Sequence, residues 1–138
     1  MKVVLSVLLL IPVFLFSQVP IALQSSEDAK NTEKIYEDVD ESATFPGGTV
    51  EMMKYISANV KYPESAMDNG EQGKVFVEFV INKDGSISNI KILKGISRDL
   101  DTEAMRVVKN MPKWTPALLD GEKVRSVARM PINFVLTE

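Results

Sequence analysis

The 138-residue sequence contains neither cysteine nor histidine. Without cysteine there can be no disulfide framework, thiolate nucleophile, thiolate zinc site or lipid-modified cysteine anchor. Without histidine the chain lacks the usual general base and the commonest metal ligand. These absences argue against most enzyme classes, so we expect no catalytic residue, no metal and no cofactor.

An enzyme built from this chain would have to use carboxylates, lysine, serine or tyrosine. The acids that could serve are Glu78, Asp84, Asp101 and Glu103. They fall on separate predicted elements, and no phosphate loop, metal-ligand spacing or nucleophile motif stands near them. We therefore predict that the protein is not an enzyme.

The net charge of −3 is unevenly distributed. Between Gln24 and Thr44 seven acids outnumber two lysines, which gives that stretch a charge of −5. From Phe45 onward, 13 basic and 12 acidic residues nearly cancel. Nucleic-acid binding therefore has no electrostatic basis. Gln24 to Thr44 is polar and poor in large apolar side chains, so we predict an acidic flexible linker over residues 18–44.

The chain begins with Lys2 followed by an apolar run of 14 residues, Val3 to Phe16. A helix of that length rises about 21 Å, which is short of the roughly 30 Å hydrocarbon core of a membrane. We predict that residues 1–17 are a signal peptide that sends the protein to the periplasm. The alternative is a short inner-membrane anchor, which would also place the domain on the periplasmic side.

Residues 45–138 are predicted to form one domain. Helical spacing of Val50, Met53, Ile56 and Val60 indicates a first helix, and a short second helix is expected to begin at Pro63. The following elements are a strand to Asn82, a hairpin turn at Asp84-Gly85, a return strand over 86–93, a helix over 97–111 and a strand over 123–136. The strand ending at Asn82 is apolar on both faces, which favours a central position in a sheet.

Three residues in this domain have a predicted structural role outside the regular pattern. Tyr62 is expected to pack its ring at the edge of the domain. Trp114 lies between Pro112 and Pro116, where large aromatics more often plug the end of a core than bind a ligand. Pro131 lacks an N–H donor, which makes the last strand an edge strand.

The order of these motifs from Phe45 onward resembles the C-terminal domain of the TonB energy transducers. The residues that carry the resemblance are Phe45-Pro46-Gly47-Gly48, Tyr62-Pro63, Gly73-Lys74-Val75, Asp84-Gly85, Leu100-Asp101, Glu103-Ala104, Met111-Pro112-Lys113-Trp114, Pro116, Gly121, Val124 and Pro131-Ile132-Asn133-Phe134. The resemblance implies a small α+β domain with a three-stranded antiparallel sheet and helices on one face. The connecting helix requires the strand order 2-1-3, which leaves one side of the last strand free.

In the family, the free edge accepts an extended segment of outer-membrane receptors, the TonB box, by strand addition, and this contact supports TonB-dependent transmembrane transport. On this chain the resemblance points to Arg125, Ser126, Val127, Ala128 and Arg129 as the partner-binding segment. Arg125 and Arg129 could instead protect an exposed edge from aggregation. An ExbB-ExbD motor in the inner membrane is an expected partner only if the N-terminal segment stays uncleaved. The alternative function is an interaction domain that homodimerises through the same strand without energy transduction.

Overall fold

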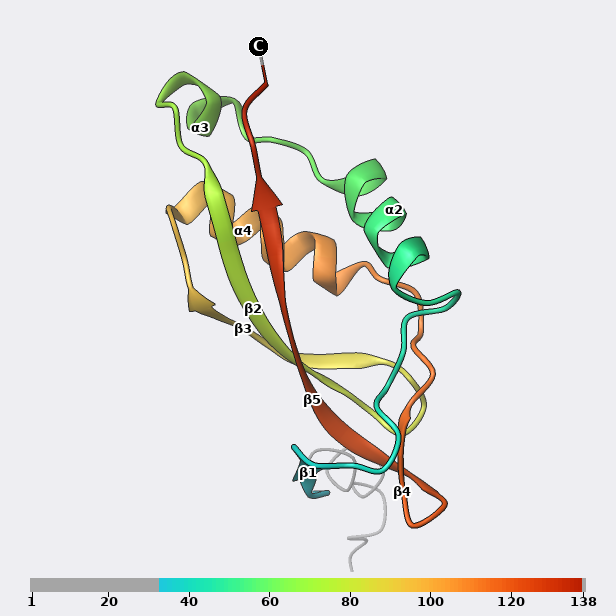
Figure 1. Cartoon of the computed structure of the whole chain (residues 1–138). Helices are drawn as coiled ribbons and strands as arrows, with labels where there is room; N and C mark the ends of the chain where they lie inside the picture. Colours follow the sequence, from blue (N-terminus) through green and yellow to red (C-terminus); the bar gives the residue numbers. More distant parts are fainter. Residues whose placement is uncertain (1–32, 138) are drawn as a thin grey trace, which may run out of the picture. The chain divides into compact units, whose positions relative to one another are not determined.

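The computed structural model describes residues 33–137, so the predicted signal peptide and the first part of the predicted linker lie outside the described residues. The strands are β1 (Ile35–Tyr36), β2 (Gly73–Ile81), β3 (Ile87–Lys94), β4 (Ala117–Leu119) and β5 (Glu122–Phe134). The helices are α2 (Thr49–Asn59), α3 (Glu64–Asp68) and α4 (Arg98–Lys109). The fold is α+β, as predicted (Figure 1).

β2 is the centre of the sheet, whose order is β1-β5-β2-β3 (Figure 1). It pairs antiparallel with β3 on one side and with β5 on the other, where the register runs from Gly73 opposite Phe134 to Ile81 opposite Ser126. The three long strands therefore have the predicted order 2-1-3. Two strands, β1 and β4, were not predicted, and both pair with β5.

The helices cover the face of the sheet that carries Val75, Val77, Phe79 and Ile81, all fully buried. Burying side chains of this size contributes about 1.5–3 kcal/mol each, which explains the central place of β2. α4 supplies Leu100, Ala104, Val107 and Val108 to the core, as its periodicity predicted. Its first turn is capped by Ser97, whose Oγ accepts a hydrogen bond from the Leu100 N–H.

The apolar face of α2 differs from the predicted one. Val50 and Met53 are 66% and 62% exposed, whereas Met52, Ile56 and Val60 pack against the core. Apolar residues at helical spacing form two overlapping faces on this helix. The face that includes Met52 packs against the core, and the face that includes Val50 and Met53 is exposed. Within residues 33–137, the helices are all too short or too polar to cross a membrane.

The predicted linker ended at Thr44, but the structure places its last part against the sheet. β1 pairs parallel with β5, and isolated bridges join Glu41 to Leu118 and Thr44 to Thr115. Ala43 packs against the core. The acidic composition predicted disorder, yet a few apolar residues and regular backbone pairing are enough to hold this segment on the domain.

Candidate functional site

The side of β5 that faces away from β2 is the candidate binding edge. Pro131 lies opposite Phe76 in the antiparallel ladder. Because proline has no N–H, it suits a pair that exchanges no hydrogen bonds with β2, and the same alternation turns the amides of Arg125, Val127 and Arg129 outward. Beyond Arg129, Pro131 offers a partner only its carbonyl. Residues Arg125 to Arg129 of this edge are the partner-binding segment predicted from sequence, and we call them the usable edge.

A short segment of the chain itself lies on this edge. We call Lys34–Val39 the strap. In it, β1 pairs parallel with β5, with Ile35 opposite Arg125 and Tyr36 opposite Ser126 (Figure 1). Among the described residues, no strand pairs with the outward side of β5 from residue 127 to 134. The candidate edge is thus occupied at its beginning and open toward its end.

Two of the five predicted partner-binding residues are buried. Arg125 is 2% exposed and Ser126 is 4% exposed. The Nε of Arg125 donates a 2.8 Å hydrogen bond to Oδ1 of Asn82, and the amide of Asn82 donates to the hydroxyls of Ser86 and Ser88 at 3.1 and 3.2 Å. The Arg125 side chain therefore fastens β5 to the β2–β3 hairpin.

Arg129 instead lies at the surface, between two carboxylates from different parts of the chain. Its Nε donates to Glu78 at 2.9 Å and its Nη2 donates to Glu37 of the strap at 2.6 Å. Burial by itself raises the pKa of Glu78, but hydrogen bonds from Lys91 and Arg129 and their positive charges outweigh it, so the pKa is lowered. Glu78 therefore stays ionised, and Arg129 joins β2, β5 and the strap.

A cavity of about 280 Å³ lies between the strap and the core side of β5. It is lined by Glu37, Val39, Ser42, Ala43, Met52, Phe79, Ile81, Trp114, Ser126, Val127, Ala128, Arg129 and Met130. The ring of Trp114 packs edge-on against Phe45 and Phe79, each with centroids 5.7 Å away. This is the core-plugging position expected from sequence. Within residues 33–137, the buried Nε1 of Trp114 has no hydrogen-bond partner.

The remaining motif residues shape the domain at a distance from the edge. Tyr62 packs edge-on against Phe134, 5.6 Å between centroids, and its hydroxyl donates to the Glu71 carbonyl. Pro63 precedes α3 as its N-cap, and Gly73 opens β2 in a positive-φ conformation. Pro112 follows the end of α4. Gly85 has φ +86° and accepts a 2.9 Å hydrogen bond from the Trp114 N–H.

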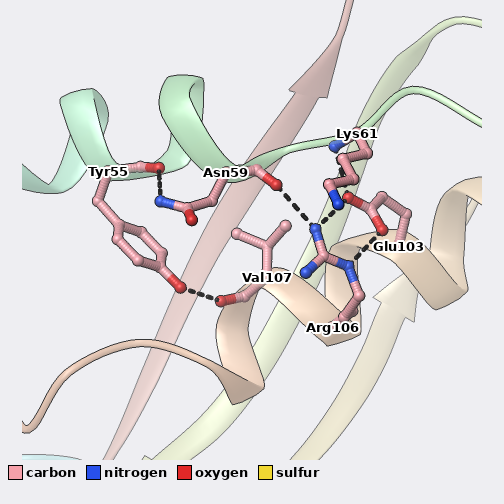
Figure 2. Close-up of polar contacts among 6 residues, drawn as sticks. All are labelled: Tyr55, Asn59, Lys61, Glu103, Arg106 and Val107. Atoms are coloured by element: carbon pink, nitrogen blue, oxygen red, sulfur yellow. Dashed lines mark hydrogen bonds and ion pairs between the residues drawn. The ribbon is translucent and has the colours of Figure 1, made fainter.

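Glu103 joins α4 to the end of α2 (Figure 2). It accepts hydrogen bonds from the Arg106 side chain at 2.7 and 2.8 Å and from the Lys61 N–H at 2.6 Å. Arg106 also donates to the Asn59 carbonyl at 2.7 Å, and the Tyr55 hydroxyl donates to the Val107 carbonyl at 3.0 Å (Figure 2). This network satisfies backbone groups where α2 ends, so its role is structural.

The network predicts a pH-dependent stability. Burial raises the pKa of Glu103, but hydrogen bonds and charges of Arg106 and Lys61 overcome this and lower it. A depressed folded-state pKa stabilises the protein above the unfolded value, about 4.3, and this contribution is lost as pH falls through the folded value. We expect Glu103→Gln to destabilise the chain by about 1–3 kcal/mol at pH 7. Urea denaturation should show a smaller difference from wild type at pH 3, and a constant difference would contradict the assignment.

The acids considered for chemistry are spread over the structure. Asp84 accepts hydrogen bonds from Ser86 within the hairpin, at 3.0 Å from the N–H and 2.6 Å from the hydroxyl. Asp101 accepts from the Ile96 N–H at 2.9 Å. Over residues 33–137, no group of three or more acidic side chains is placed to hold a metal ion. Each of the four acids thus has its own structural contact, with Arg129 for Glu78, Ser86 for Asp84, Ile96 for Asp101 and Arg106 for Glu103.

Comparison with known proteins finds similarity to TonB proteins. The family of the Gram-negative bacterial TonB protein C-terminal matches residues 58–136. Protein TonB of Xanthomonas campestris pv. campestris (strain B100) is 30% identical over 91 residues, which cover 65% of this chain and 40% of that protein. Protein TonB of Helicobacter pylori (strain J99 / ATCC 700824) is 39% identical over 84 residues, which cover 60% of this chain and 29% of that protein.

A solved structure also matches. The solution NMR structure of the H. pylori TonB C-terminal domain is 31% identical, with a TM-score of 0.48, and the match covers 64% of this chain and 94% of that one. The match to the curated relatives is limited to part of their length, since the chain spans 40% of the X. campestris protein and 29% of the H. pylori protein.

Proposed function

The chain belongs to the TonB C-terminal domain family, and from that membership we propose that it binds an extended segment, the TonB box, of outer-membrane receptors by strand addition. Binding would support TonB-dependent transport across the outer membrane. The domain acts in the periplasm in this proposal, either released by removal of residues 1–17 or held at the inner membrane by them. In the second case an ExbB-ExbD motor is the proposed energy source.

The outward edge of β5 is the single observation that carries the proposal. β5 pairs with β2 from Ser126 to Phe134, while on its other side β1 pairs only with Arg125 and Ser126. An added strand gains main-chain hydrogen bonds, each contributing about 0.5–1.5 kcal/mol net. Arg129 lies beside this edge and already binds carboxylates, so it favours a segment that carries an acidic residue.

A peptide titration tests the proposal. We expect a synthetic TonB-box peptide from a receptor of the source bacterium to shift the amide NMR signals of Val127, Ala128 and Arg129. The signals of β3, at the opposite edge of the sheet, should stay in place because β2 lies between the two edges. A spectrum that remains unchanged at millimolar peptide would reject strand addition.

The control is the same peptide with proline at alternate positions. Proline removes the N–H donors that a ladder needs, but it leaves the other side chains in place. Equal shifts with both peptides would show that side chains alone drive the contact, contrary to the proposal.

A homodimer formed through the same edge is the second candidate function. An unpaired strand edge is a ready template for a second copy, and two-fold dimers are the commonest assemblies. Sedimentation of the chain over a range of concentrations separates the two functions, because a strict monomer removes the dimer and leaves the receptor segment as the occupant.

A further inference from the structure

The strap and an added partner strand would compete for the same outward peptide groups of β5. Neighbouring strands lie about 4.8 Å apart and use one row of outward peptide groups, so only one strand can pair with a given stretch of β5. The strap pairs with Arg125 and Ser126, and its Glu37 reaches on to Arg129. A strand that pairs with the whole usable edge therefore cannot bind while the strap is in place.

The strap is weakly held, whereas the segment that follows it is firmly anchored. β1 has only two paired residues, and the Glu37–Arg129 ion pair is exposed, with 63% and 51% of the two side chains accessible. Exposed ion pairs of this kind contribute little to stability. After the strap, Asp40 and Glu41 donate from their N–H groups to the Leu118 carbonyl at 3.0 and 3.1 Å.

The anchor continues to Thr44, which exchanges two backbone hydrogen bonds with Thr115 at 3.0 and 2.8 Å. The Asp40 carboxylate also accepts from the Asp120 N–H at 2.8 Å. Separation of the strap from β5 would thus stop at Asp40, and the rest of the domain would keep its contacts. The cavity behind the strap already provides space beside the core face of β5.

We propose that the strap, Lys34–Val39, is a built-in substitute for the partner strand that an external segment must displace from β5. The inference rests on the proposed function. It also defines the partner's chemistry: an extended segment, running parallel to β5, with two apolar residues followed by an acid that replaces Glu37 on Arg129. In the strap those positions are Ile35, Tyr36 and Glu37. Arg129 keeps its contact with Glu78 during the exchange.

A reversible lock tests the exchange. The chain has no cysteine, so Tyr36→Cys with Ser126→Cys introduces one possible disulfide. These residues are directly paired on adjacent strands, a spacing within the 4.4–6.8 Å that a disulfide spans between Cα atoms. With the full chain and the TonB-box peptide, we expect oxidation to weaken binding at least tenfold and reduction to restore it. Comparing two redox states of one variant cancels the effect of the substitutions.

A second variant loosens the strap. Glu37→Gln removes its ion pair with Arg129, so the peptide is expected to bind about two- to fivefold more tightly. Glu41→Gln makes the same change of charge in the anchored segment, where Glu41 is held through its backbone, and should leave the affinity unchanged.

The outcomes separate the two ideas. If the oxidised lock binds the peptide as tightly as the reduced form, the strap is not displaced and the inference is overturned, while the proposed function stands. If the peptide binds neither wild type, nor Glu37→Gln, nor the reduced variant, the proposed function is overturned and the inference falls with it.

Discussion

Gly85→Ala is expected to lower the free energy of unfolding by about 2–6 kcal/mol. Two costs add. Gly85 has φ +86°, and a non-glycine residue held there costs about 1–3 kcal/mol. A Cβ at this position would also lie 2.1 Å from the Trp114 carbonyl oxygen, so the backbone itself must move, which costs about 1–3 kcal/mol more. Urea denaturation measures the loss.

Gly121→Ala is the matched control for this change. Gly121 has φ +80°, and a Cβ there meets no atom within 4 Å. This variant therefore carries the cost of the backbone conformation without the collision, and we expect a loss of about 1–3 kcal/mol. Equal losses for the two variants would mean that the approach of Trp114 to Gly85 has no energetic importance. The approach matters for the binding edge because Thr115, the next residue, holds Thr44 and thereby the anchor of the strap.

Arg125→Ala is expected to destabilise the domain by about 2–4 kcal/mol. The change removes a buried hydrogen bond from a charged donor, leaves Oδ1 of Asn82 with fewer partners and removes packed methylene groups. Thermal unfolding followed by circular dichroism should show a large decrease in melting temperature.

Arg129→Ala is the comparison for Arg125→Ala. Its side chain is 51% exposed and its ion pairs lie at the surface, so we expect at most about 1 kcal/mol of lost stability. Arg129→Ala should instead lower the affinity for a receptor peptide that carries an acidic residue. A stable Arg125→Ala together with an unstable Arg129→Ala would be the opposite result. It would contradict the structural role given to buried Arg125 and the binding role proposed for exposed Arg129.

Local patterns in the sequence were enough to predict most of the sheet. The alternation in β2, the turn at Asp84-Gly85 and the apolar stripe of α4 each depend on neighbours within a few residues, and each is present as expected. These three features follow from backbone geometry that the sequence determines locally. Pro131 predicted that the last strand is an edge strand, and this is wrong for its first part, because β4 and β1 pair with β5 up to Ser126.

Features that depend on distant partners were not predictable in the same way. The strap lies in an acidic stretch whose composition predicted disorder, and Ile35, Tyr36 and Val39 were the available signal against it. The pairing of Ile35 and Tyr36 depends on β5, some 90 residues further along the chain. The lack of room for a side chain at Gly85 likewise depends on a distant residue, Trp114. The sequence predicted which residues a partner would use, and this stays a prediction, whereas the pairing of the strap with Arg125 and Ser126 is seen only in the structure.

The strap is the first described element of the chain, and its release has a mechanical consequence. On release, the six residues Lys34–Val39 would separate from β5 and lengthen the part of the chain that precedes the domain. Fully extended, they add about 20 Å of reach. If residues 1–17 hold the domain at the inner membrane, which is one form of the proposed function, binding of a receptor segment would therefore lengthen the connection between the membrane and the domain.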